Sequence, residues 1–158
     1  MCVTMLEREG TGATPAHSVA SPASPQETPA SLRINRLVLV IEDYESAREL
    51  YAKCLEWAGF RVALASNGVD GVDQAIKLRP AVIVMDVFMP LLDGLEATRR
   101  LKDNDRTRGI PVIACTAWPS TEKYPDLFHA YVEKPCLPSV LIAAVRDALG
   151  HRFPDDAP

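Results

Sequence analysis

The sequence predicts an α/β fold in which a doubly wound, five-stranded parallel sheet is covered by helices on both faces. Two observations carry this prediction. Short runs of β-branched and aliphatic residues recur five times along the chain, and amphipathic stretches with helical spacing separate most of them. Strands that alternate with helices form right-handed βαβ units, and continuously apolar strands are typical of a sheet buried on both faces.

The first half of the chain contains two strands and the helix between them. Leu37–Ile41 is a continuous apolar run and is the first expected strand. Residues 46–58 follow with apolar side chains at helical spacing and end at Gly59. We expect Trp57 on this helix to lie in the core or to cover part of it. Residues 60–65 are the second expected strand.

The second half repeats the alternation. The remaining strands are expected at residues 81–85, 110–115 and 130–133. The remaining helices are expected at residues 69–78, 94–102 and 139–149. The last helix has Ser139 as its expected N-cap and Gly150 as its terminator. Pro119 and Pro125 lie between the fourth and fifth strands, so any helix there is expected to be short or distorted.

Length and composition predict one domain with two tails, since 158 residues suit a single core. Residues 1–33 are rich in Pro, Ala, Ser and Thr and cannot bury enough apolar surface to offset their ordering entropy, so we expect a disordered tail. The domain is expected to span residues 34–151. Residues 152–158 are expected to be a short C-terminal tail.

Charge and hydropathy argue against two classes of partner. The formal net charge is −4 and the basic residues are dispersed, which is unlike a nucleic-acid-binding protein. No apolar stretch is long enough to cross a bilayer, so we expect no membrane partner. The four cysteines form no CxxC pair and the N-terminus lacks a secretory signal, which favours a cytoplasmic protein.

Polar side chains stand at the ends of four of the predicted strands. Glu42 and Asp43 follow the first strand, Asp86 the third, Thr116 the fourth and Lys134 the fifth. The carboxyl ends of parallel strands meet at one edge of a sheet, where ligands collect. We therefore expect these five side chains to lie close together.

Three carboxylates at one edge repel one another, and either protonation of one or capture of a hard divalent cation relieves the repulsion. A site made of oxygen ligands with room for waters suits Mg²⁺. Glu42, Asp43 and Asp86 are the expected ligands, directly or through water, and the backbone carbonyl of Phe88 is a further candidate.

These residues resemble the receiver domain of response regulators, and the resemblance covers about residues 36–150. The motifs that carry it are Glu42-Asp43, the stretch 84–90 followed by Asp93-Gly94, Thr116-Ala117 and Lys134-Pro135. The resemblance implies a flavodoxin-like fold with strand order 2-1-3-4-5. The interval between Thr116 and Lys134 is shorter than is usual in the family, which implies a shortened fourth helix.

The resemblance also implies a function, that of a stand-alone receiver similar to chemotaxis regulators. Asp86 would be the phosphoacceptor for a histidine kinase or histidine phosphotransfer protein, with Thr116 and Lys134 as the other catalytic residues. Tyr131 would be the aromatic switch partner of Thr116. Such a protein catalyses only its own phosphorylation and dephosphorylation, and signals by contact with a downstream protein or by phosphorelay.

Other functions remain open at this point. A receiver-like protein-binding module that phosphorylation does not regulate would have the same fold. A phosphatase-like hydrolase would carry a second acid two residues after the nucleophile, where this chain has Phe88. A flavin-binding electron carrier would need a phosphate loop rich in hydroxyls and glycine at residues 42–45, which here read Glu-Asp-Tyr-Glu.

Overall fold

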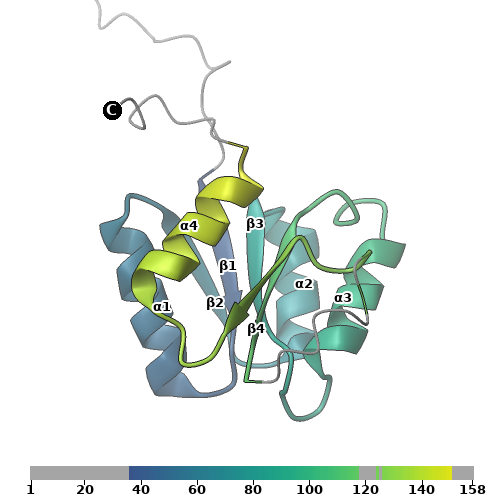
Figure 1. The fold of residues 1–158 in the computed structure, drawn as a ribbon. Helices are drawn as coiled ribbons and strands as arrows, with labels where there is room; N and C mark the ends of the chain where they lie inside the picture. Colours follow the sequence, from purple (N-terminus) through teal and green to yellow (C-terminus); the bar gives the residue numbers. More distant parts are fainter. Residues whose placement is uncertain (1–35, 118–123, 125, 151–158) are drawn as a thin grey trace, which may run out of the picture. The chain divides into compact units, whose positions relative to one another are not determined.

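A computed structural model describes residues 36–117, 124 and 126–150, which contain a five-stranded sheet with helices on both faces (Figure 1). All pairings between neighbouring strands are parallel, and the order is β2-β1-β3-β4-β5, as the resemblance implied. The strands are β1 (Leu37–Ile41), β2 (Arg61–Ala65), β3 (Val82–Asp86), β4 (Val112–Thr116) and β5 (Ala130–Glu133).

Four helices cover the sheet in the described residues. They are α1 (Glu45–Trp57), α2 (Gly68–Leu78), α3 (Gly94–Asp103) and α4 (Pro138–Ala148). Helices α1 and α4 lie on one face, and α2 and α3 lie on the other (Figure 1). The predicted doubly wound α/β architecture is therefore confirmed.

Two apolar layers follow from the alternation of side chains along the strands. In β1, Leu39 and Ile41 pack with residues of α2 and α3, whereas Val38 and Val40 pack with residues of α1 and α4. Every residue of β3 and β4 is buried. These central strands are buried on both faces, which explains why they read as uninterrupted apolar runs.

Two of the helices begin at a residue whose polar side chain caps the N-terminus. The Asn67 side chain accepts a hydrogen bond from the amide of Asp70, and the Asp93 side chain accepts one of 2.8 Å from the amide of Glu96. Each contact satisfies an amide at a helix N-terminus that has no partner within the helix. The Asp93 cap fixes the start of α3 a few residues after the end of β3.

The start of α4 differs from the prediction. The N-cap is Leu137, which makes no side-chain capping hydrogen bond, and Pro138 is the first helical residue. Ser139 is therefore not the N-cap. The proline ring fixes φ near the helical value and lacks an amide hydrogen that would need a partner, so a helix readily begins on it. Gly150 follows α4 with a φ of 66°, as expected of a terminator.

Trp57 was expected to lie in the core or to cover part of it, and this was wrong: the residue is 90% exposed. The buried positions of α1 are Tyr51, Ala52 and Leu55. Trp57 stands two positions after Leu55, and residues two apart on a helix do not share a face.

The ends of two strands also shift. Strands β3 and β4 end at Asp86 and Thr116, one residue later than predicted, so both polar residues belong to the strands themselves. The expected short helix between β4 and β5 falls largely on residues 118–123 and 125, outside the described residues, as do the predicted tails at 1–33 and 152–158. In the part of the chain that the structure describes, no helix is both long and apolar enough to cross a membrane.

Candidate functional site

The carboxyl ends of four strands supply the predicted site residues. Glu42 and Asp43 directly follow β1, Asp86 is the last residue of β3, Thr116 is the last residue of β4, and Lys134 directly follows β5. Parallel pairing places these four strand ends at one edge of the sheet. The polar groups therefore occupy the edge at which ligands bind in open α/β sheets.

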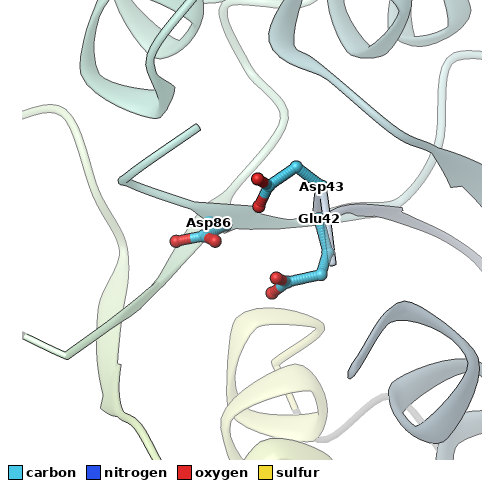
Figure 2. Close-up of side chains that lie close together, drawn as sticks. All are labelled: Glu42, Asp43 and Asp86. Atoms are coloured by element: carbon cyan, nitrogen blue, oxygen red, sulfur yellow. The ribbon is translucent and has the colours of Figure 1, made fainter. Parts of the chain in front are cut away.

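Three carboxylates form a cluster there. Glu42, Asp43 and Asp86 each contribute an oxygen, and these oxygens lie within 4.8 Å of one another. Figure 2 shows the three side chains gathered where the chain leaves β1 beside the end of β3. Glu42 is 2% and Asp86 5% exposed, whereas Asp43 is open to solvent. Two of the three acids are thus held where water screens their charges poorly.

Lys134 bridges the two buried acids. Its Nζ lies 2.8 Å from Oε2 of Glu42 and 2.8 Å from Oδ2 of Asp86. The backbone amide of Lys134 also donates a 2.9 Å hydrogen bond to the carbonyl of Thr116. The ammonium is therefore held by its own side-chain contacts and by the pairing of β5 with β4.

Burial and charge shift two pKa values in this cluster. Burial raises the pKa of Glu42, the hydrogen bond from Lys134 opposes that rise, and the negative charge of Asp86 adds to it. The net result is a pKa above the usual value. Burial alone would lower the pKa of Lys134, but hydrogen bonds to Asp86 and Glu42 outweigh it and raise the pKa. Lys134 is therefore firmly protonated at neutral pH.

The loop after β3 fixes the carboxylate of Asp86. The amide of Phe88 donates to Oδ1 of Asp86 at 3.0 Å, and the amide of Gly94 donates to the carbonyl of Val87 at 3.0 Å. A Cβ at position 94 would overlap the backbone carbonyl of Asp86, so glycine allows this close approach. Phe88 therefore contacts Asp86 through its backbone amide. A metal-binding role for its carbonyl stays a prediction.

Thr116 and Tyr131 lie on neighbouring strands. Thr116 is buried, and Tyr131 pairs with Ala114, which stands two residues before Thr116 on β4. Residues two apart on a strand face the same side of the sheet. The hydroxyl of Tyr131 donates to the carbonyl of Tyr124 at 3.0 Å. The register thus puts Tyr131 and Thr116 on one side, and their joint role as a switch stays a prediction.

One contact at the site was not anticipated from the sequence. Nη1 of Arg48 donates to the carbonyl of Glu42 at 2.8 Å and to the carbonyl of Asp43 at 3.2 Å. The one sequence feature that could have indicated this contact is the position of Arg48 near the start of α1, where the helix dipole disfavours a cation. Such a residue needs another partner, but the sequence does not say which one.

The cluster has the donors of a site for a hard divalent cation. It offers carboxylate oxygens from three side chains, one of them open to solvent. Among the described residues, these carboxylates share a single ammonium partner, that of Lys134. Oxygen donors in excess over cationic partners, with room for water, fit a metal such as Mg²⁺.

Comparison with known proteins agrees with this geometry. Residues 38–146 match the family described as response regulator receiver domain. The chain is 34% identical over 117 residues to the polar-differentiation response regulator DivK of Brucella anthropi, covering 72% of this chain and 95% of DivK. It is also 34% identical over 125 residues to the response regulator MprA of Mycobacterium sp. strain KMS, covering 77% of this chain. The chain spans about half the length of MprA, at 54%.

Solved structures show the same fold. The chemotaxis protein CheY4 of Vibrio cholerae aligns with a TM-score of 0.68 at 26% identity, covering 73% of this chain and 99% of CheY4. The receiver domain of the sensor histidine kinase PA1611 from Pseudomonas aeruginosa, which has a magnesium ion coordinated in its active-site cleft, aligns with a TM-score of 0.68 at 27% identity. That alignment covers 74% of this chain and 99% of the PA1611 domain. The chain therefore belongs to the response regulator receiver domain family of two-component signalling.

Proposed function

We propose that this receiver accepts a phosphoryl group on Asp86 from a histidine kinase or a histidine phosphotransfer protein. The observation that carries the proposal is the environment of the Asp86 carboxylate. It lies at the end of β3, beside two further acids, with the Lys134 ammonium 2.8 Å from Oδ2 and the Phe88 amide 3.0 Å from Oδ1. A buried carboxylate that is oriented in this way is suited to act as a nucleophile.

The transfer step follows from the chemistry of a phosphohistidine. A carboxylate oxygen of Asp86 attacks the phosphorus, an O–P bond forms, and the P–N bond to the donor histidine breaks. The histidine nitrogen leaves with the electron pair and takes up a proton. Positive charge and hydrogen-bond donors around the equatorial oxygens lower the barrier to such a transfer. Lys134 supplies charge there, and the Thr116 hydroxyl supplies a hydrogen bond.

The acidic cluster is the proposed magnesium site. Glu42, Asp43 and Asp86 would hold the ion directly or through water, and the Phe88 carbonyl would be a further ligand. When bound, a magnesium ion neutralises the carboxylates and the charge on the transferring oxygens. The magnesium ion in the similar PA1611 receiver domain supports this assignment.

Output is proposed to run through protein contact or phosphorelay. A phosphoryl group adds negative charge and acceptor oxygens at the edge of the sheet, which draw the Thr116 hydroxyl and the Lys134 ammonium toward it. Tyr131, on the same side of the sheet as Thr116, then moves into the space that Thr116 leaves. The protein modifies only itself, within a receiver domain of residues 34–151, and a downstream protein reads the changed surface.

Chemical trapping tests the phosphoacceptor. The protein is incubated with acetyl phosphate and Mg²⁺ and then reduced with borohydride, which converts an aspartyl phosphate into homoserine. Peptide mapping is expected to find homoserine at position 86 and at no other aspartate. Homoserine at a different aspartate would show that Asp86 is not the phosphoacceptor. If the chain is instead a protein-binding module that phosphorylation does not regulate, no homoserine is expected with any phosphodonor.

A further inference from the structure

Arg48 contacts three successive carbonyls of the segment that carries the acidic pair. Its Nη1 donates to the carbonyl of Glu42 at 2.8 Å and to that of Asp43 at 3.2 Å. Its backbone amide donates to the carbonyl of Tyr44 at 3.0 Å, as the first turn of α1 begins. The Arg48 guanidinium thus holds the backbone of both acidic residues at the turn from β1 into α1, and its amide makes the ordinary hydrogen bond of the first helical turn.

Other hydrogen bonds also restrain this turn. The amide of Tyr44 donates to Oε1 of Glu42, at a long 3.4 Å. The amide of Glu42 still joins the sheet through a 3.1 Å hydrogen bond to the carbonyl of Ala65, but the chain then leaves the strand. Tyr44 is the N-cap of α1 and makes no side-chain capping hydrogen bond. A guanidinium carries five N–H donors in a fixed plane, so it is well suited to hold neighbouring carbonyls in one orientation.

The two carbonyls belong to the residues whose carboxylates join Asp86 in the acidic cluster. Glu42 is additionally held by Lys134 at 2.8 Å, whereas Asp43 is exposed and, among the described residues, has no basic side chain on its carboxylate. The direction in which the Asp43 side chain leaves the backbone therefore depends on the backbone itself. That backbone is what Arg48 holds.

We propose that Arg48 is a positioning residue for the magnesium site. It fixes the Glu42–Asp43 backbone so that both carboxylates meet Asp86 at the spacing that one divalent cation requires. The inference rests on the proposed function, because it assumes that the acidic cluster binds Mg²⁺. It adds a residue on α1 that touches neither the metal nor the phosphoryl group.

Because Arg48 is positively charged, the direction in which its removal changes the Mg²⁺ affinity tests the proposal. A nearby cation repels Mg²⁺, so if only charge mattered, removing the guanidinium would tighten Mg²⁺ binding. If positioning dominates, removing it loosens the acidic pair and weakens Mg²⁺ binding despite the lost repulsion. The two outcomes have opposite directions.

Isothermal titration of Mg²⁺ into the full-length protein separates these outcomes. Arg48→Met is expected to weaken Mg²⁺ binding about tenfold, the scale seen when groups that orient metal ligands are removed. The matched control is Lys53→Met, since Lys53 also lies on α1 but is exposed and, among the described residues, pairs with Glu49 at 3.8 Å. Its Mg²⁺ affinity is expected to stay within about twofold of wild type, because surface charges contribute little.

A kinetic readout accompanies the titration. With acetyl phosphate as donor, the Mg²⁺ concentration that gives half the maximal rate is expected to rise with the dissociation constant in Arg48→Met, while the rate at saturating Mg²⁺ stays near that of wild type. Thermal unfolding checks that each variant is folded. If Arg48→Met does not fold, Arg48→Gln takes its place and is expected to weaken Mg²⁺ binding in the same direction.

The result that overturns the inference is Mg²⁺ binding by the folded Arg48 variant that is as tight as, or tighter than, that of wild type. This differs from a failure of the proposed function, in which the wild-type protein itself would neither bind Mg²⁺ nor take up a phosphoryl group.

Discussion

Lys134 and Asp86 lie 48 positions apart in the sequence, and the Nζ of Lys134 is 2.8 Å from Oδ2 of Asp86. The same Nζ is 2.8 Å from Oε2 of Glu42. The Lys134 side chain is 22% exposed and the two acids are nearly buried. One ammonium therefore compensates two carboxylates in a poorly solvated place, which couples the stability of the fold to the chemistry of the site.

Replacing Lys134 by methionine is expected to destabilise the metal-free protein. Glu42 and Asp86 would face each other without a cation, and removal of one partner from a buried ion pair costs about 3 kcal/mol at the lower end of the usual range. The measurement is urea unfolding in EDTA, with Lys53→Met as the exposed control. Adding Mg²⁺ is expected to stabilise Lys134→Met more than wild type, because the metal replaces the missing charge. An unfolding free energy equal to that of wild type in EDTA would show that the ion pair contributes nothing.

Replacing Glu42 by glutamine is expected to stabilise the metal-free protein at neutral pH, because the amide carries no charge to bury. Burial raises the pKa of Glu42 above its usual value of 4.5, so the folded state binds more protons than the unfolded state and wild-type stability falls as pH rises from 4.5 through the folded pKa. Glutamine does not titrate, so the stability of the variant does not fall with pH for this reason. Its advantage is therefore expected at pH 7 and not at pH 4.5.

Urea unfolding of Glu42→Gln and wild type in EDTA at the two pH values measures the difference. The Mg²⁺ affinity of the variant is expected to be lower, since one of the three proposed carboxylate ligands is lost. A variant less stable than wild type at pH 7 would mean that the ion pair with Lys134 outweighs the cost of burying the Glu42 charge.

Replacing Gly94 by alanine is expected to destabilise the protein by about 2 kcal/mol or more, as overpacking against backbone does. The new Cβ would overlap the carbonyl of Asp86 and lie 2.8 Å from Cα of Val87. The same displacement moves the Asp86 carboxylate, so phosphorylation by acetyl phosphate is expected to slow. The control is Gly109→Ala, where a Cβ meets open space. Equal unfolding free energies for the two alanine variants would contradict the account.

Much of the fold and of the site follows from local patterns. The bounds of β1 and β5 match those read from the sequence, because a short apolar run between polar residues leaves few alternatives. The meeting of Glu42, Asp86 and Lys134 follows from one rule, that the carboxyl ends of parallel strands share an edge. No pairing between individual residues was needed to predict it.

The remainder depends on contacts that a sequence pattern does not contain. Helical spacing does not give the rotation of α1 against the sheet, so the exposure of Trp57 was missed. Pro138 outweighed Ser139 at the start of α4, since ring geometry decided over capping chemistry. The bonds from Arg48 to two carbonyls join a side chain to backbone, and almost any residue offers such an acceptor.

The measurement that tests the central claim most directly is the intact mass of the protein after incubation with acetyl phosphate, with Mg²⁺ or with EDTA. Wild type, Asp86→Asn and the exposed control Asp73→Asn are compared. We predict a gain of one phosphoryl group in wild type and Asp73→Asn with Mg²⁺, and none in EDTA or in Asp86→Asn. A gain that persists in Asp86→Asn, or that does not depend on Mg²⁺, would contradict this prediction.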